Sequence, residues 1–132
     1  MSYIETRNAV IESTMLGYEG HGIFSAYLQL DYGCAGQSFG GYAMDEPKGE
    51  RGAGRHRVGT AFGMDFIIAV MKVVGVESWE ELKGKHVRVK SDFGKVYALG
   101  NFLKDEWFTP EDLAQKHKQP TPPAVSGERG DK

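Results

Sequence analysis

The sequence predicts an α+β domain: an antiparallel sheet of about five strands, with one main helix packed on a face and a short helix near the C-terminus. The first observation is an apolar stripe at three- and four-residue spacing within residues 60–74, which is typical of one face of a helix. The second is a set of short segments in which apolar and polar residues alternate, as in strands. The connections between successive strands are too short for the crossovers that parallel strands need.

The main helix is predicted to begin after Thr60, a suitable N-cap, and to end at Gly75, which can adopt the left-handed conformation of many helix ends. No other segment carries comparable apolar surface at helical spacing, so this helix is expected to cover the sheet. Its apolar stripe consists of Phe62, Phe66, Ile67, Val70, Val73 and Val74. The expected contacts on the sheet are Leu28, Leu30, Val87, Val89 and Leu99.

Strands are predicted at residues 9–16, 24–32, 39–44, 86–90 and 95–103. The strand at 24–32 has the clearest alternation, with Leu28 and Leu30 on one face and Tyr27 and Gln29 on the other. Glycines inside the strand at 39–44 predict a bulge or the close approach of another backbone or a ligand. The polar, glycine-rich segment 46–59 has no periodicity and is predicted to be a loop.

Two short helical segments complete the prediction. Residues 78–82 are expected to form one turn of helix, with Ser78 as the N-cap and Glu81 three residues later. Thr109 and Pro110 begin the C-terminal helix, because proline is favoured at the first helical position. The polar, proline-rich residues 115–132 are predicted to be a disordered tail. Residues 1–114 would then form the single compact domain expected of a 132-residue chain.

The overall composition is that of a soluble globular protein. A hydrophobic share of 40%, a charged share of 26% and a net charge of −2 give no overall attraction to nucleic acid or anionic membranes. Cys34 is the single cysteine, which excludes an internal disulfide. The N-terminus lacks the basic and apolar regions of a signal peptide, and no apolar run has the length of a membrane span. A cytoplasmic protein without membrane contacts is therefore expected.

Acidic and basic residues are unevenly distributed. Residues 1–47 contain six acidic residues and one arginine, a net charge of −5, whereas residues 48–104 contain eleven basic and six acidic residues, a net charge of +5. The two groups could neutralise each other across a sheet or form two surfaces of opposite sign. On the second interpretation, an acidic surface would imitate nucleic acid towards a basic groove of a partner protein. Its residues would be Glu12, Glu19, Asp31, Asp45 and Glu46.

The segment 54–60 reads GRHRVGT and leads directly into the main helix. Backbone N–H groups at a helix N-terminus attract anions, and glycines let the backbone approach a phosphate. The lysine of the pattern G-x-x-x-x-G-K-[ST] is missing, so a nucleotide hydrolase is not indicated. A solvated loop and an anion site remain as alternatives. The anion site would use Arg55, His56, Arg57, Gly59 and Thr60, with Tyr32, Phe39 and Tyr42 as a stacking surface for a base.

A basic segment follows the helix and includes His86, Arg88 and Lys90, which share one face of the strand at 86–90. Such a row could follow a phosphate backbone. Aromatic residues are not interleaved on that face in the sequence, and a charged row also protects an exposed strand from aggregation. The solvated face is therefore the preferred interpretation, with nucleic-acid contact as the alternative.

No catalytic or metal-binding motif is present. The histidines lack the H-E-x-x-H and H-x-x-x-H spacings of metal sites. Cys34 with His21 or His56 would supply a nucleophile and a base only if the fold brought them together. We therefore expect a protein that is not an enzyme and that uses no cofactor or metal.

Four segments resemble a group of small proteins encoded by bacteriophages and prophages. They are IESTMLGYE at 11–19, LDYG at 30–33 with FGGYA at 39–43, SWEELKGK at 78–85 and GNFLKD at 100–105. The similarity covers most of residues 3–113 and excludes the tail. The group has no established activity or catalytic residues, so no site residue is carried over. The resemblance implies a bacterial or phage setting, in which small accessory proteins often bind a host component, including defence machinery such as CRISPR effectors.

Two functional hypotheses follow. The first is a non-enzymatic, phage-type accessory protein that binds and occludes a host protein or protein complex, with a CRISPR-type defence complex as one candidate. The second is a protein that binds a small anionic ligand such as a nucleotide through residues 54–60. The sequence does not indicate an oligomeric state.

Overall fold

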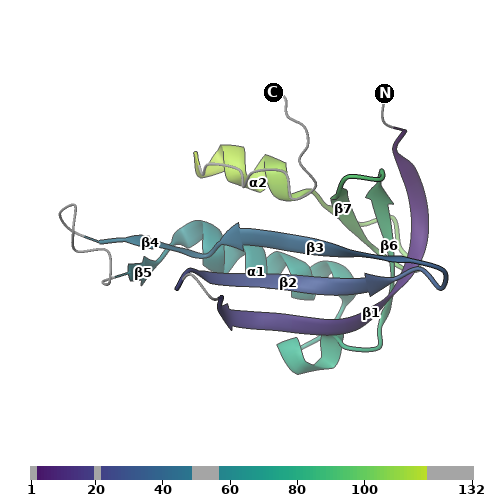
Figure 1. Cartoon of the computed structure of the whole chain (residues 1–132), viewed down its shortest axis with the longest axis horizontal. Helices are drawn as coiled ribbons and strands as arrows, with labels where there is room; N and C mark the ends of the chain where they lie inside the picture. The colour runs from purple at the N-terminus through teal and green to yellow at the C-terminus, as the bar shows by residue number, and fades with distance from the viewer. Residues whose placement is uncertain (1–2, 20–21, 49–56, 119–132) are drawn as a thin grey trace.

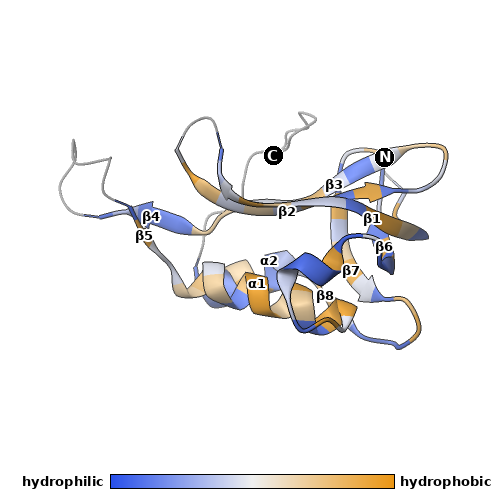
Figure 2. Cartoon of the chain, turned by 90° about the horizontal axis from the view of Figure 1, so that it is seen from below, coloured by the Kyte–Doolittle hydropathy of each residue, from blue (hydrophilic) through white to orange (hydrophobic). Residues whose placement is uncertain are grey.

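The computed structural model describes residues 3–19, 22–48 and 57–118. They form an α+β fold with a six-stranded antiparallel sheet in the order β3-β2-β1-β6-β7-β8 (Figure 1). The strands are β1 (Glu5–Tyr18), β2 (Phe24–Asp31), β3 (Gly36–Ala43), β6 (His86–Ser91), β7 (Val96–Asn101) and β8 (Trp107–Phe108). The helices α1 (Ala61–Val74) and α2 (Pro110–Lys116) lie on the same side of β1, β2 and β3 (Figure 2). The predicted fold class is confirmed.

β1 is long enough to pair with two different strands, one along each half. Residues 5–10 pair with β6 along one edge, and residues 10–18 pair with β2 along the other. The exchange of partner coincides with a β-bulge between Ile11 and Ser13. A bulge adds one residue to a strand, so the alternation of faces shifts there. The strand predicted at 9–16 includes this bulge and is shorter than β1 at both ends, because residues 5–8 are all polar and show no alternation.

The main helix begins and ends where the sequence predicts. The Thr60 hydroxyl oxygen accepts a hydrogen bond from the Gly63 N–H at 2.9 Å, which satisfies one of the free donors of the first turn. Gly75 has a φ of 94°, and its N–H donates to the Met71 carbonyl at 2.8 Å. That left-handed conformation suits glycine and closes the helix.

The core lies between the sheet and α1. The expected contact residues of the sheet, Leu28, Leu30, Val87, Val89 and Leu99, are all buried. Phe66 is at the centre of an aromatic cluster, with its ring centroid 5.9 Å from Phe39 and 5.3 Å from Phe108. On α1 the fully covered positions are Phe62, Gly63, Phe66, Val70 and Val73, whereas Ile67 and Val74 are only partly buried.

The structure contains strands that the sequence does not predict. β4 (Asp45–Pro47) and β5 (Arg57–Gly59) form a two-stranded hairpin within the segment 46–59 that was predicted to be a loop. β8 pairs with β7 at the edge of the main sheet. These elements have two or three residues each, so no alternation of apolar and polar residues can reveal them.

Elements near the C-terminus differ in detail from the prediction. β7 ends at Asn101, not at 103, because the Asn101 side-chain oxygen accepts hydrogen bonds from the Leu103 and Lys104 N–H groups at 2.9 and 2.8 Å and forms a turn. The short helix η1 (Trp79–Leu82) is present as expected, without a side-chain hydrogen bond from Ser78. α2 continues to Lys116, two residues beyond the predicted end of the compact domain at residue 114, and residues 119–132 lie outside the described residues.

Candidate functional site

The predicted anion site at the start of α1 contains an internal ion pair. Arg57 donates from Nε and Nη2 to the two carboxylate oxygens of Asp45, each at 3.0 Å. Asp45 is 6% exposed and also accepts a hydrogen bond from the Phe24 N–H at 3.2 Å. The hydrogen bonds that Arg57 donates to Asp45 raise the pKa of its guanidinium. Arg57 therefore stabilises the β4–β5 hairpin. Arg55 and His56 lie outside the described residues.

Thr60 and Gly59 are also engaged in the fold. The Thr60 hydroxyl donates to the Met44 carbonyl at 3.1 Å while it accepts from the Gly63 N–H. Gly59 pairs with Asp45 in the hairpin. A side chain of the protein thus already caps the first turn of α1, and this reduces the capacity of that turn to bind an anion.

Of the three aromatic residues predicted to stack on a base, two belong to the core. Phe39 is 1% exposed and Tyr42 is 6% exposed, and both pack against Phe66. Their ring faces are covered by other side chains, so the prediction that they form a ligand surface is wrong. Tyr32 is half-buried, and it lies under the Arg7 guanidinium at 4.3 Å from the ring centroid.

Burial, and to a smaller extent the nearby Glu111 carboxylate, raises the pKa of Tyr42 from its ordinary value of 10.0 to about 12. Below pH 10 the folded and unfolded states both carry the phenolic proton. Between pH 10 and 12 the unfolded state loses it first, so this residue makes the free energy of unfolding fall as the pH rises. We expect the urea midpoint of the wild-type protein to fall more between pH 9 and pH 11 than that of Tyr42→Phe. Equal losses would contradict a protonated, buried Tyr42.

The acidic residues predicted to bind a partner do not form one surface. Asp45 is buried in its ion pair, which removes it from any partner surface. Glu12 and Glu19 stand towards the two ends of the β1 segment that pairs with β2, and both are exposed. Asp31 is at the end of β2, and Glu46 is in the separate hairpin. The five residues therefore lie on different elements and at different ends of the sheet, and they do not form a single acidic cluster.

The row of basic residues on β6 faces solvent, as predicted, and the structure adds aromatic residues to it. Trp107 on β8 lies beside Arg88 and Lys90, with cation-to-centroid distances of 5.0 and 4.4 Å. Phe102, which follows β7, has its ring centroid 5.3 Å from that of His86. The interpretation of a row without aromatic neighbours is therefore wrong.

Gly100 makes the contact between Trp107 and the basic row possible. It lies on β7 between Arg88 and Trp107 in the register of the sheet. A Cβ at Gly100 would come within 2.6 Å of the Trp107 ring, so only glycine lets this ring lie across β7. A glycine in a strand, followed closely by a tryptophan, is the one sequence signal that could have indicated this arrangement.

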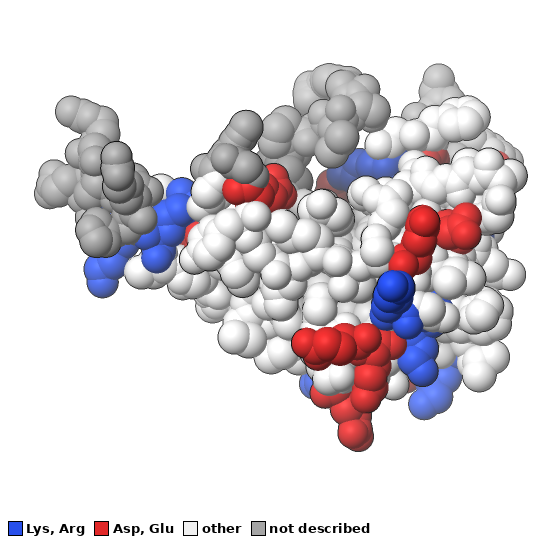
Figure 3. All heavy atoms as spheres, turned by 60° about the horizontal axis from the view of Figure 1, so that its bottom comes forward, with Lys and Arg blue, Asp and Glu red and all other residues white. Residues whose placement is uncertain are grey.

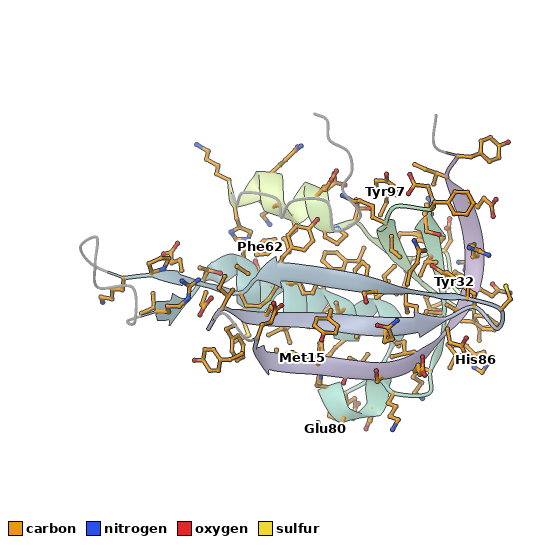
Figure 4. The ribbon with its side chains drawn as sticks, in the orientation of Figure 1. Met15, Tyr32, Phe62, Glu80, His86 and Tyr97 are labelled. Atoms are coloured by element: carbon orange, nitrogen blue, oxygen red, sulfur yellow. The ribbon has the colours of Figure 1, made fainter. Side chains whose placement is uncertain are left out.

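A shallow groove of about 260 Å³ lies at the end of this row (Figure 4 labels Tyr32 and His86 there). It forms where β2 diverges from β1, so that the turn after β2 stands apart from the first half of β1. Polar and aromatic side chains meet in it. The lining residues are Asn8, Ala9, Val10, Asp31, Tyr32, Gly33, His86 and Phe102.

The second half of β1 has an edge that no described strand covers. β6 pairs with residues 5–10 only, and the backbone contact on that side ends at Ile11, which exchanges hydrogen bonds with Gly84 and Lys85. Beyond it, residues 13–18 have β2 on one side and no strand among the described residues on the other. An uncovered edge presents backbone N–H and C=O groups that can pair with another chain.

Exposed apolar side chains are present on this part of β1 and on α1. Leu16 and Tyr18 are opposite Ala26 and Phe24, so their side chains point to the helix side of the sheet, and they are 38% and 68% exposed. Met64 and Ile68 lie four residues apart on α1 and are 58% and 43% exposed. Figure 3 shows a broad uncharged surface on this side of the molecule, bordered by both acidic and basic side chains.

The elements around α1 indicate which flank of the helix faces the uncovered edge of β1. Asp65 binds His117 of α2 at 2.9 Å, and Ala69 and Lys72 line a groove with β8. These residues define one flank of the helix, covered by α2 and β8. Met64 and Ile67 are on the opposite flank by helical periodicity, towards the uncovered edge of β1. We call Leu16, Tyr18 and Met64, together with the edge of residues 13–18, the β1 edge surface.

The described residues give no catalytic or metal centre. No group of three or more His, Cys, Asp or Glu among them could hold a metal ion. Cys34 is exposed in the turn between β2 and β3, while His21 and His56 lie outside the described residues, so their predicted relation to Cys34 stays a hypothesis. None of the described helices is long and apolar enough to cross a membrane. No protein-family model, curated protein or solved structure matches this chain.

Proposed function

We propose that this protein is a non-enzymatic binding protein, and that its β1 edge surface binds an extended segment of another protein. The observation that supports this most is the uncovered edge of residues 13–18, with exposed Leu16 and Tyr18 on it and exposed Met64 on the flank of α1 towards it. Monomeric proteins generally protect strand edges with charges, bulges or covering elements. A partner strand added here would extend the sheet, and its side chains would contact α1.

The charges around the β1 edge surface indicate the chemistry of the partner segment. No Lys, Arg, Asp or Glu occurs in residues 13–18, but Glu12 and Glu19 flank them and are exposed. On η1 and beside it, Glu77, Glu80 and Glu81 outnumber Lys83 and Lys85. A segment with an apolar centre and basic ends would therefore match this surface. Glu12 and Glu19 are the two predicted partner-binding residues that retain this role in the proposal.

The setting follows from the resemblance to phage and prophage proteins. On that basis the partner is a protein of the bacterial host, with a CRISPR-type defence complex as one candidate, and the protein would act by occluding it. The proposal needs no cofactor or catalytic residue. A partner segment that is bound to the β1 edge surface cannot at the same time make its other contacts.

The proposal can be tested by selection from a displayed peptide library in which apolar segments carry either Lys and Arg or Asp and Glu at their ends. We expect the wild-type protein to enrich apolar segments with basic ends. The double variant Leu16→Lys, Met64→Lys should bind the enriched peptides at least about tenfold more weakly, since charged groups would have to be buried without partners. The matched control is Leu103→Lys, Gln115→Lys, which adds the same charge at exposed positions elsewhere.

Three outcomes would overturn the proposal: no enrichment, enrichment of acid-flanked segments, or equal binding by both double variants. Self-association of the wild-type protein that is lost only in Leu16→Lys, Met64→Lys would also overturn it, because the occupant would then be a second copy. Light scattering measures this. Capture from a host lysate, followed by phage plating with and without the protein, then tests whether the bound protein is a defence component.

A further inference from the structure

We infer that the uncovered face of β1, β6 and β7 is a second binding site, which takes single-stranded nucleic acid with a guanine base in the groove of about 260 Å³. This face is remote from the β1 edge surface, because its side chains point away from α1. It is also distinct from the start of α1, where the sequence places an anion site. A result that overturns one of the two proposals therefore does not overturn the other.

The register of the strands places the relevant side chains in rows across the sheet. In the first row, Val10 is opposite Asp31 on one side and His86 on the other, and Phe102 lies beside His86. Val10 thus forms a floor between a carboxylate and an imidazole. Asp31, His86 and Phe102 are all exposed, so a ligand can reach them.

The next two rows supply positive charge. Asn8 is opposite Arg88, which is followed across the sheet by Gly100 and Trp107. Thr6 is opposite Lys90. No carboxylate among the described residues forms an ion pair with Arg88 or Lys90. Cations that lack an acidic partner and lie next to aromatic rings are the usual combination of surfaces that bind single strands.

Arg88 is held in place by the fold. Its Nε donates to the Asn101 carbonyl at 2.9 Å and its Nη2 donates to the Lys104 carbonyl at 2.8 Å. A guanidinium has five N–H donors, so three remain for a phosphate. Because the side chain is already ordered, it loses little conformational freedom when it binds. Arg88 and Lys90 would therefore contact the backbone of the strand next to the base in the groove.

The size of the groove fits one flat ring. Ligand sites for whole cofactors commonly have volumes of about 300–1,000 Å³, and this groove is smaller. The Phe102 ring is 38% exposed and offers a stacking face, as aromatic residues do for unpaired bases. The phosphates would then remain outside, near the basic rows.

Asp31 determines which base the groove prefers. A carboxylate only accepts hydrogen bonds, so it matches an edge with two adjacent donors, which guanine presents at N1–H and its exocyclic amine. One Asp31 oxygen, Oδ1, accepts from the Gly33 N–H at 2.8 Å, and this bond fixes the carboxylate at the rim of the groove. The remaining lone pairs are available to a ligand. The Asn8 amide can donate to the guanine carbonyl.

Fluorescence anisotropy with short labelled oligonucleotides would test the inference. The probes are an eight-nucleotide uridine RNA, the same RNA with one central guanosine, the matching thymidine DNA pair, and free GMP as a competitor. We expect the central guanosine to tighten binding by roughly tenfold. Asp31→Asn should abolish this preference, because an amide presents a donor where guanine also has one. Asparagine still accepts from Gly33, so the turn is retained.

Phe102→Ala should weaken binding of every strand by about tenfold through lost stacking. Lys90→Ala should weaken the binding of all oligonucleotides equally. It should also reduce the salt dependence of binding by about the amount expected for one phosphate contact. The controls are Asp112→Asn and Leu103→Ala, at exposed positions outside the groove.

Binding of GMP as tight as binding of the guanosine RNA would show a free-nucleotide site and overturn the strand proposal. No binding of any probe at low salt, or a guanosine preference retained by Asp31→Asn, would overturn it as well. Comparison of the RNA and DNA pairs identifies which polymer is bound. Loss of peptide binding in Leu16→Lys, Met64→Lys with intact oligonucleotide binding would separate this site from the β1 edge surface.

Discussion

Phe66→Ala is expected to lower the free energy of unfolding by about 3–5 kcal/mol, a large part of the total stability of a small domain. The side chain is 1% exposed and contacts four rings: Phe39 and Tyr42 of β3, Phe62 of α1 and Phe108 of β8. These rings are themselves fixed by the sheet and cannot close a cavity of that size. The variant should therefore be largely unfolded or insoluble, as measured by urea unfolding followed by circular dichroism.

Lys72→Ala is the matched control on the same helix. Lys72 is exposed, and substitutions at exposed positions usually change stability by less than about 0.5 kcal/mol. Its urea midpoint should be close to that of the wild type. If both variants had the same midpoint, α1 would not hold the core together.

Gly63→Ala is expected to lower the free energy of unfolding by roughly 1–3 kcal/mol, although alanine is ordinarily favoured over glycine in helices by about 1 kcal/mol. The reason is the close contact between α1 and the chain before the β4–β5 hairpin. A Cβ at Gly63 would come within 2.4 Å of the Met44 carbonyl oxygen and 2.8 Å of its Cα. These are backbone atoms of a segment that is itself hydrogen-bonded to Thr60 and to Phe24. They cannot move aside as the end of a flexible side chain can.

Gly59→Ala provides the comparison for this variant. A Cβ at Gly59 would meet nothing within 4 Å. Its substitution should leave the urea midpoint nearly unchanged. A stabilised Gly63→Ala, with the ordinary helical preference for alanine, would show that α1 can move away from Met44.

The parts of the fold that the sequence predicts are those governed by neighbours along the chain. The caps of α1 depend on Thr60 and Gly75, each within a few residues of the helix they end. The inward positions of β6 depend on alternation alone, and Val87 and Val89 are buried as predicted. Where an element is too short to show a period, as in β8, this reasoning fails. Where a strand continues into residues that are all polar, as at residues 5–8 of β1, it gives a strand that is too short.

The predicted ligand residues illustrate a different limit. Phe39 and Tyr42 follow a glycine-rich turn, and the sequence does not show whether an aromatic ring beside glycines faces a ligand or the core. The structure decides it, because β3 places both rings against α1. Arg57 and Asp45 are 12 residues apart, and only the hairpin brings them into an ion pair. The sequence shows both charged residues, but it does not show that they pair with each other.

The sequence by itself determined the fold class, the position and caps of α1, and the outward orientation of the basic residues of β6. Local periodicity and capping chemistry are enough for these features. Only the tertiary structure decided which surfaces are free. β1 exchanges partners in its middle, which leaves residues 13–18 with an uncovered edge and opens a groove beside Asp31. Trp107 reaches the basic row across Gly100 through a pairing of β7 with β8. Such contacts join residues distant in the chain, so no local pattern encodes them.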